Sequence, residues 1–150
     1  MLVDMESGRY EHLLKPERSG VYLVPRDVEA LRDASARARL AWFELETAGA
    51  RDKPQFLAAC AKSLEFPEWF GTNWDALADC LRDFSWRGAP GYVVLWRGGA
   101  ALAAAAPESF ATALEIFRDA ASYWKESGRI FLVLLDHEPA GTMLPRLPGA

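Results

Sequence analysis

Two aspartates, Asp75 and Asp79, have the residue type and the spacing that most clearly offer chemistry in this sequence. Four positions apart on a helix, they would point the same way from successive turns, where two like charges cost about 0.2–0.5 kcal/mol. A charge in the first helical turn is favoured by the free amides and the helix dipole, which explains Asp75 better than Asp79. The spacing alone leaves two interpretations open: a solvated helix face, or an anionic pair that binds a cationic group.

Aromatic residues lie on both sides of this acidic pair. They are Trp69, Phe70, Trp74, Phe84 and Trp86. Carboxylates framed by rings form a surface that can desolvate and hold a cationic group of a partner. Gly71 is expected to take a positive φ in the turn before the helix, which would aim Trp69. We therefore predict that the working surface lies in residues 66 to 86.

The charge of the chain is concentrated around the same segment. The formal net charge is -4. Between residues 65 and 83 the acidic side chains are Glu65, Glu68, Asp75, Asp79 and Asp83, and the basic one is Arg82. Such a patch repels nucleic acid and attracts a basic partner. We expect a protein partner with a positively charged site and no direct contact with nucleic acid.

Strand patterns and helix patterns alternate along the chain. Short apolar runs predict strands at residues 21 to 24, 40 to 45, 93 to 96 and 130 to 135. Helical spacing predicts helices at residues 27 to 38, 54 to 64, 74 to 83 and 109 to 126, with Asp27 and Asn73 as N-caps and Pro54 in a first turn. This order predicts an α/β fold with a small parallel sheet covered by helices.

The chain is expected to form one domain with additions at both ends. Residues 1–39 form an extension that adds an edge strand and a helix to the core. Residues 40–138 are the core itself. Residues 139–150, with four Pro and Gly positions among them in the run from Pro139 to Pro148, are expected to be a flexible tail.

Other groups that could do chemistry are better explained as structure. Cys60 and Cys80 sit in apolar helical patterns and are interpreted as reduced core thiols. His12 and His137 lack ligand spacing, so we expect no metal and no cofactor. Residues 136 to 138 at a strand end are a possible hydrolase site, but no nucleophile elbow or phosphate-binding loop accompanies them. The chain is predicted not to be an enzyme.

The ends and apolar runs also bear on location. The first ten residues carry Asp4, Glu6 and Arg9, which is not the pattern of a signal or transit peptide. The longest strongly apolar run, residues 130 to 135, is far shorter than the roughly twenty residues that span a bilayer. We expect a cytoplasmic protein with no membrane role, monomeric when free.

The run FPEWFGTNWDALADCL at residues 66 to 81 resembles the barstar-like inhibitors of small microbial ribonucleases. The resemblance continues in the apolar strand ending at Leu95 and Trp96, in EIFRDA at residues 115 to 120, and in the strand at residues 130 to 135. Together these segments cover roughly residues 40 to 136. The motif of proline, two aromatics, glycine, asparagine and Asp-Ala-Leu is long and specific.

This resemblance implies that the helix lies across a ribonuclease active site. Its carboxylates would stand where RNA phosphates bind and would engage catalytic arginine, lysine and histidine. By motif position, the implied contacts are Trp69, Asp75, Asp79 and Asp119, together with a ring after the helix that is either Phe84 or Trp86. The implied partner is a small guanyl-specific bacterial ribonuclease, blocked by mimicry of RNA.

The sequence departs from the family pattern in three places. Ala78 stands where barstar itself has a large aromatic residue, and Tyr123 stands near the position of a second acid in the last helix. The extension before Leu40 is absent from the minimal family member. These departures keep an alternative open, in which the same helix serves an immunity or interaction module for a different basic toxin or an RNA-binding protein.

Overall fold

A four-stranded parallel sheet forms the centre of the molecule. The structure is a computed structural model and describes residues 10–139 and 141–147. The strands are β1 (Gly20–Leu23), β2 (Ala41–Glu46), β3 (Gly91–Arg97) and β4 (Ile130–Leu135), in the spatial order β1-β4-β3-β2. All three neighbouring pairs are parallel. The predicted α/β class is confirmed, and the strand of the extension, β1, lies at one edge of the sheet as expected.

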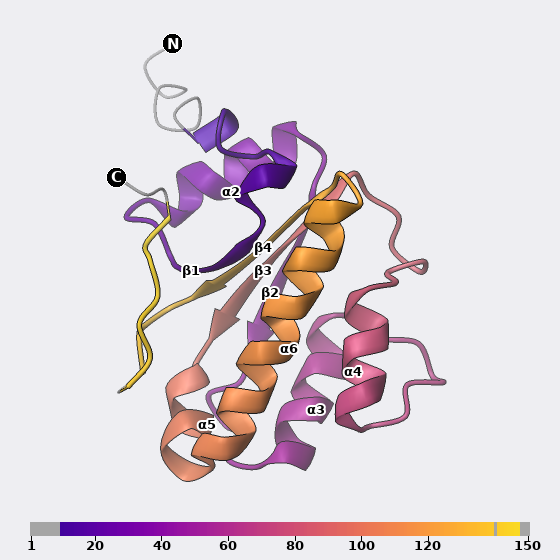
Figure 1. Ribbon diagram of the computed structural model, residues 1–150, viewed down its shortest axis with the longest axis vertical. Coiled ribbons are helices and arrows are strands. Elements are labelled where there is room, and N and C mark those ends of the chain that lie inside the picture. The colour runs from indigo at the N-terminus through magenta and orange to yellow at the C-terminus, as the bar shows by residue number, and fades with distance from the viewer. Residues whose placement is uncertain (1–9, 140, 148–150) are drawn as a thin grey trace.

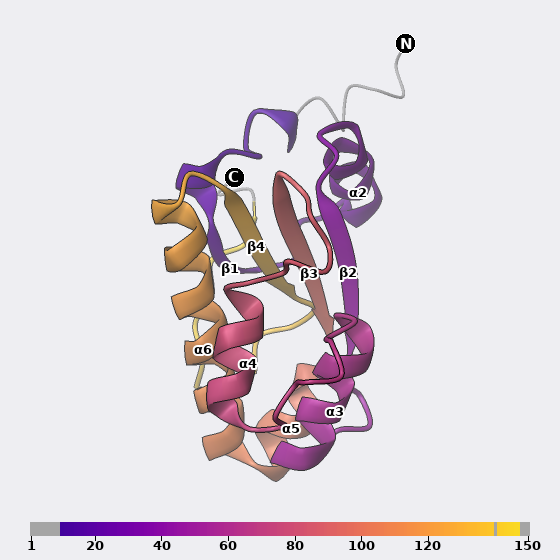
Figure 2. The same cartoon turned by 90° about the vertical axis from the view of Figure 1, so that its right-hand side faces the viewer.

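Helices cover both faces of the sheet (Figure 1). They are α2 (Val28–Arg37), α3 (Lys53–Ser63), α4 (Trp74–Leu81), α5 (Gly99–Ala105) and α6 (Pro107–Glu126), with a short 3-10 turn, η1, at Pro16–Arg18. Figure 2 shows α2 on one side of the sheet and α3, α4 and α6 on the other. Within the described residues, no helix is long and apolar enough to cross a membrane.

Alternate residues of the central strands supply the two cores. Tyr92, Val94 and Trp96 of β3 pack into the core beneath α3, α4 and α6, whereas Val93 and Leu95 pack into the smaller core beneath α2. This division follows from the two-residue period of a strand. Both faces are buried, which is why β3 and β4 are apolar on consecutive residues.

Side-chain caps begin the helices that the sequence predicted. Asp27 accepts a hydrogen bond from the Ala30 amide at 3.0 Å, and Asn73 accepts one from the Ala76 amide at 2.8 Å. Each cap contributes about 1 kcal/mol. The α3 helix begins slightly earlier than predicted, because Asp52 caps it and Pro54 lies in its first turn.

The alanine-rich segment after β3 forms a helix, α5, that the sequence analysis did not predict. Gly98 takes the left-handed conformation, with φ 74, and its amide donates to Asp136 Oδ2 at 3.0 Å. Alanine has the highest helix propensity, so a fixed start is enough to make the following residues helical. The α6 helix then begins at Pro107, two residues before the predicted start.

Residues 141–147 of the expected flexible tail lie along the edge of the sheet, while residues 140 and 148–150 of that prediction lie outside the described residues. The Leu23 amide donates to the Pro145 carbonyl at 2.8 Å, and the Leu147 amide donates to the Leu23 carbonyl at 3.1 Å. Leu144 and Leu147 are buried. The segment therefore lies beside the edge strand β1 through a single parallel bridge between Leu23 and Arg146, and its two buried leucines anchor it.

Candidate functional site

The loop before α4 owes its shape to Thr72 and not to Gly71. Thr72 has a positive φ of 50, whereas Gly71 lies outside the left-handed region, so the predicted role of this glycine is wrong. A Cβ on Gly71 would meet Asn73 Nδ2 at 3.5 Å and Ala76 Cβ at 3.6 Å, which are ordinary contacts. The turn thus strains a threonine to bring the chain into the helix.

Asn73 and Trp74 fix the start of α4. Besides capping the helix, Asn73 donates through Nδ2 to the Gly71 carbonyl at 3.3 Å, which ties the loop to the cap. The half-buried Trp74 ring packs on Phe56 of α3, with centroids 6.2 Å apart, and Lys53 lies over it at 5.3 Å. Both predicted site residues therefore position the helix, and their side chains have partners within the chain.

The inner face of α4 is fully engaged with the core. Leu77, Cys80 and Leu81 are buried. The Leu81 carbonyl also accepts a hydrogen bond from Trp124 Nε1 of α6 at 2.7 Å. These contacts fix the rotation of the short helix, so its remaining side chains must face away from the sheet.

The acidic pair lies on the outward face of α4. Asp75 and Asp79 are both exposed, one turn apart, and the Asp79 side chain is 71% accessible. Asp79 Oδ1 lies 3.1 Å from Arg82 Nη2. Ala78, between the two acids, is partly buried and adds no bulk to the surface. The pair is therefore available to a partner, with one of its members already next to a cation.

Two tryptophans from opposite ends of α4 form the aromatic part of the surface. Trp69 is 63% exposed and meets the Trp86 ring edge to face, with centroids 6.2 Å apart. Trp86 is half-buried, meets Phe66 edge to face at 5.7 Å, and donates through Nε1 to the Leu64 carbonyl at 3.3 Å. Trp86 thus supports Trp69 from below and keeps some accessible surface of its own.

Phe84 belongs to the core and not to the surface. Its side chain is 1% exposed and stacks against Phe43 and Tyr92, with centroids 5.4 and 4.6 Å apart. Its backbone has a positive φ of 52, as a chain that turns sharply at the end of a helix requires. Of the two rings that the sequence offered after the helix, the structure therefore leaves Trp86 accessible and buries Phe84.

The remaining predicted contacts lie around this centre. Phe70 is partly buried, with its ring 4.9 Å from that of Phe66, and contributes mainly packing. Asp119 is exposed on α6. The α6 helix runs beside α4 (Figure 2) and contacts it. Tyr123 is exposed one turn after Asp119 on the same helix, so the two share a face.

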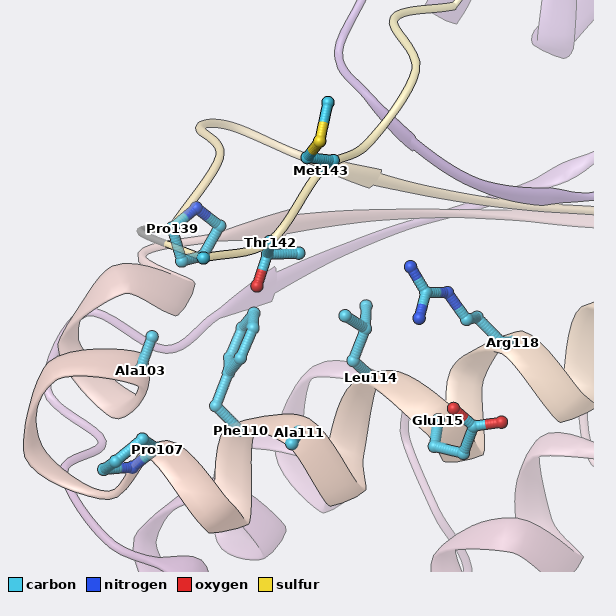
Figure 3. A pocket seen from close by; sticks show the side chains of 11 residues that line it. Ala103, Pro107, Phe110, Ala111, Leu114, Glu115, Arg118, Pro139, Thr142 and Met143 are labelled. Carbon is cyan, nitrogen blue, oxygen red and sulfur yellow. The ribbon is translucent and has the colours of Figure 1, made fainter.

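A hollow of about 380 Å³ lies elsewhere, between α5, α6 and the tail (Figure 3). Phe110 and Leu114 point into it, and Pro139 and Met143 close it from the tail. None of the predicted site residues lines this hollow. The candidate site is therefore separate from this hollow and is formed by α4 and its flanking loops.

The strand end that could have held a hydrolase site has structural partners. Asp136 accepts the Gly98 amide, and Glu138 Oε2 accepts the Leu144 amide at 2.6 Å. His137 Nδ1 lies 3.9 Å from Asp136 Oδ1. Among the residues that the structure describes, no three His, Cys, Asp or Glu side chains gather as a metal site would require. Asp136 therefore fixes the start of α5, and Glu138 holds the tail.

Both cysteines are buried, unpaired thiols. Burial raises the pKa of the Cys60 thiol well above its usual value. Burial, with Asp83 and Asp79 nearby, raises the pKa of Cys80 to about 11. Neutral, buried thiols are poor nucleophiles, so the structure supports the prediction that they are core residues.

Comparison with known protein families matches residues 40–136 to the family described as Barstar (barnase inhibitor). The matched region begins at the end of the α2–β2 connection and ends directly after β4, so it contains the whole candidate surface. No curated protein matches the chain significantly.

Sequence reasoning missed the contact between Arg82 and Asp79, although their spacing of three residues could have indicated it.

Proposed function

Because the chain belongs to the barstar family of barnase inhibitors, we propose that it is a cytoplasmic inhibitor of a small guanyl-specific bacterial ribonuclease. In this proposal α4 enters the active site of the enzyme and occupies the place of the RNA. The protein thereby protects the cell that makes the ribonuclease.

The outward acidic pair is the observation that carries the proposal. A ribonuclease binds phosphates with cationic side chains, and exposed carboxylates one helical turn apart offer these side chains alternative anions. Asp75 and Asp79 are held at the surface by a helix whose inner face is fully packed, so little freedom is lost when they bind. The partner would meet an anion that is already in place.

The rings supply the apolar part of the same contact. Trp69 stands out from the surface on a base formed by Trp86. Exposed tryptophan is unusual on a surface and is enriched at the centres of protein interfaces. We propose that Trp69 and the accessible part of Trp86 cover the acidic pair when the partner is bound, with Asp119 contributing a further charge from α6.

The test is to titrate the protein into a panel of small guanyl-specific ribonucleases and follow RNA cleavage. We expect cleavage to stop at equimolar protein for at least one enzyme. Asp79→Asn should raise the inhibition constant by a factor that corresponds to more than about 2 kcal/mol, as a central hot spot does. Full cleavage across the panel with excess protein would overturn the proposal.

Asp33→Asn is the matched control for that variant. Asp33 is an exposed aspartate on α2, which covers the opposite face of the sheet, and its replacement changes the net charge equally. We expect it to inhibit like the unmodified protein. A similar loss in both variants would mean that net charge, and not the α4 surface, governs binding.

A second candidate is an immunity or interaction module for another basic protein, such as a toxin with a different nuclease fold. The small side chain of Ala78 and the presence of Tyr123 near Asp119 favour it, because the first replaces a large aromatic contact and the second stands near the place of an acid. Pull-down from the native cell with the Asp79→Asn variant as control would identify such a partner.

A further inference from the structure

Arg82 lies inside the acidic surface and is bonded to it at two points. Its Nη2 is 3.1 Å from Asp79 Oδ1, and its Nε donates to the Ala78 carbonyl at 3.2 Å. Long side chains on a helix point back toward its N-terminus, so Arg82 at the end of α4 lies over the preceding turn. The guanidinium thus covers one oxygen of the acid that we place at the centre of the site.

The two acids of the pair are therefore not equivalent. Asp79 forms an ion pair with Arg82. No ion pair in the described part of the molecule involves Asp75. Arg82 is also the basic residue within the acidic stretch from 65 to 83. A cationic partner would meet Asp75 unopposed and Asp79 in competition with Arg82.

We propose that Arg82 is a specificity-determining residue of this surface, an internal cation that a partner must displace from Asp79. The proposal rests on the function proposed above. A partner whose cationic group reaches Asp79 with several donors replaces the contact to Arg82, while a partner with a single weak donor does not. Arg82 thus lowers the affinity for all basic partners and narrows the set that binds.

Ala78 permits this arrangement. Residues four apart on a helix are neighbours, so the side chain at position 78 borders the path of Arg82. The methyl group of Ala78 leaves this path open, and a large ring in its place would compete for the same space. We therefore expect the small side chain of Ala78 to be what allows the Arg82 guanidinium to contact Asp79.

The expected size of the effect is modest. Both side chains of the pair are substantially exposed, and exposed ion pairs of this kind alter an equilibrium by at most about fivefold. Removing the guanidinium also removes a positive charge that opposes the approach of a basic partner. Both terms have the same sign, so replacing Arg82 should tighten binding.

The experiment compares Arg82→Gln and Arg82→Lys with the unmodified protein, using a ribonuclease from the panel as the probe. We expect Arg82→Gln to lower the dissociation constant about two- to fivefold at low salt, and less at high salt because exposed pairs are screened. Arg82→Lys cannot donate from the same two positions but keeps the positive charge. Because that charge still opposes a basic partner, Arg82→Lys should tighten binding less than Arg82→Gln.

The sign of the change separates this role from a structural one. A cation near a helix C-terminus also stabilises the helix, so a purely structural Arg82 would give weaker binding in Arg82→Gln. Unchanged or weaker binding by Arg82→Gln would overturn the inference, provided that the unmodified protein inhibits the probe. Asp79→Asn should also raise the dissociation constant by a larger factor in the Arg82→Gln protein than in the unmodified one.

A measurement on the free protein distinguishes a failure of the inference on Arg82 from a failure of the proposed inhibitor function. The Arg82 Nε–H signal in a nitrogen-edited NMR spectrum should move on Asp79→Asn and stay in place on Asp33→Asn. An unmoved signal in Asp79→Asn would overturn the inference. Absence of inhibition by both the unmodified protein and Arg82→Gln would instead overturn the proposed function.

Discussion

Trp69 and Trp86 meet edge to face, with ring centroids 6.2 Å apart and planes at 81°, although α4 separates them in the chain. This contact joins the loop before the helix to the segment after it. The Trp86 indole is fixed in turn by its hydrogen bond to the Leu64 carbonyl. The two loops that frame the acidic helix therefore act as one support, and the exposed ring of Trp69 rests on it.

Trp69→Ala should weaken partner binding by about 2 kcal/mol or more, because it removes the exposed ring at the centre of the proposed contact. The free energy of unfolding should change little, since 63% of the residue is already in water. Calorimetric titration with an inhibited ribonuclease and urea unfolding measure the two effects.

Met143→Ala is the control for this variant. Met143 is also a large exposed apolar residue, but it lies in the tail and lines the hollow between α5, α6 and the tail (Figure 3), to which no residue of α4 contributes. We expect no change in binding. Equal affinity of Trp69→Ala and Met143→Ala would show that Trp69 lies outside the contact.

Phe84→Ala should destabilise the fold by about 3–5 kcal/mol, the usual cost of truncating a buried phenylalanine. The ring contacts Phe43 of β2 and Tyr92 of β3, so its loss leaves a cavity between α4 and the sheet. Chemical denaturation should show this shift. A loss below about 1 kcal/mol would contradict the burial of this ring.

The sequence predicted the fold well wherever periodicity or a cap carried the information. The strand at residues 130 to 135 was predicted with its observed bounds, and Asp27 and Asn73 cap the helices assigned to them. Prediction failed where a distant contact decides the structure. The α5 helix follows its N-cap residue Gly98, whose amide bonds to Asp136, and residues 141–147 are bonded to Leu23.

Which side chains of the site are accessible depends on the same kind of information. Spacing on one helix was enough to predict that Asp75 and Asp79 share a face. The choice between Phe84 and Trp86 could not be made, because both rings follow the helix and only the packing of Phe84 against two strands distinguishes them. Likewise, the strained residue of the loop is Thr72 and not the more permissive Gly71.

Association with the ribonuclease should slow as salt is added. The surface is acidic and the proposed partner site is basic, and charge steering of this kind is screened over about 8–10 Å at 0.1–0.15 M salt. Barnase and barstar are themselves a standard example of such steering, so the direction is expected from the family. Stopped-flow rates at several salt concentrations measure it, and Asp75→Asn should reduce the slope. A rate independent of salt would contradict an electrostatic approach.

Stability should fall as the pH rises above about 9, in part through Cys80. Burial, together with Asp83 and Asp79, raises the pKa of this thiol to about 11 from an ordinary value of 9. Between these values the unfolded chain releases the proton and the folded chain keeps it, so the free energy of unfolding decreases with pH. Urea unfolding at pH 8 and pH 10.5 should show a smaller decrease for Cys80→Ala than for the unmodified protein. Equal decreases would mean that Cys80 does not titrate as its surroundings indicate.

Leu147→Ala should destabilise the protein by about 2–4 kcal/mol, even though a tail rich in proline and glycine is expected to tolerate change. The Leu147 side chain is buried in the smaller core with Leu31 and Leu132, and its amide bonds to the Leu23 carbonyl at 3.1 Å.

Arg146→Ala separates the packing of Leu147 from a side-chain hydrogen bond at this edge. It removes the donor of the 2.8 Å bond from Arg146 Nη1 to the Val24 carbonyl but leaves the leucine in place. Because that bond is exposed, we expect a loss of about 1 kcal/mol or less. Thermal or urea unfolding compares the two variants. If Leu147→Ala were as mild as Arg146→Ala, the tail would contribute little to the fold, and the edge strand β1 would be held mainly by its contacts with β4 and α6.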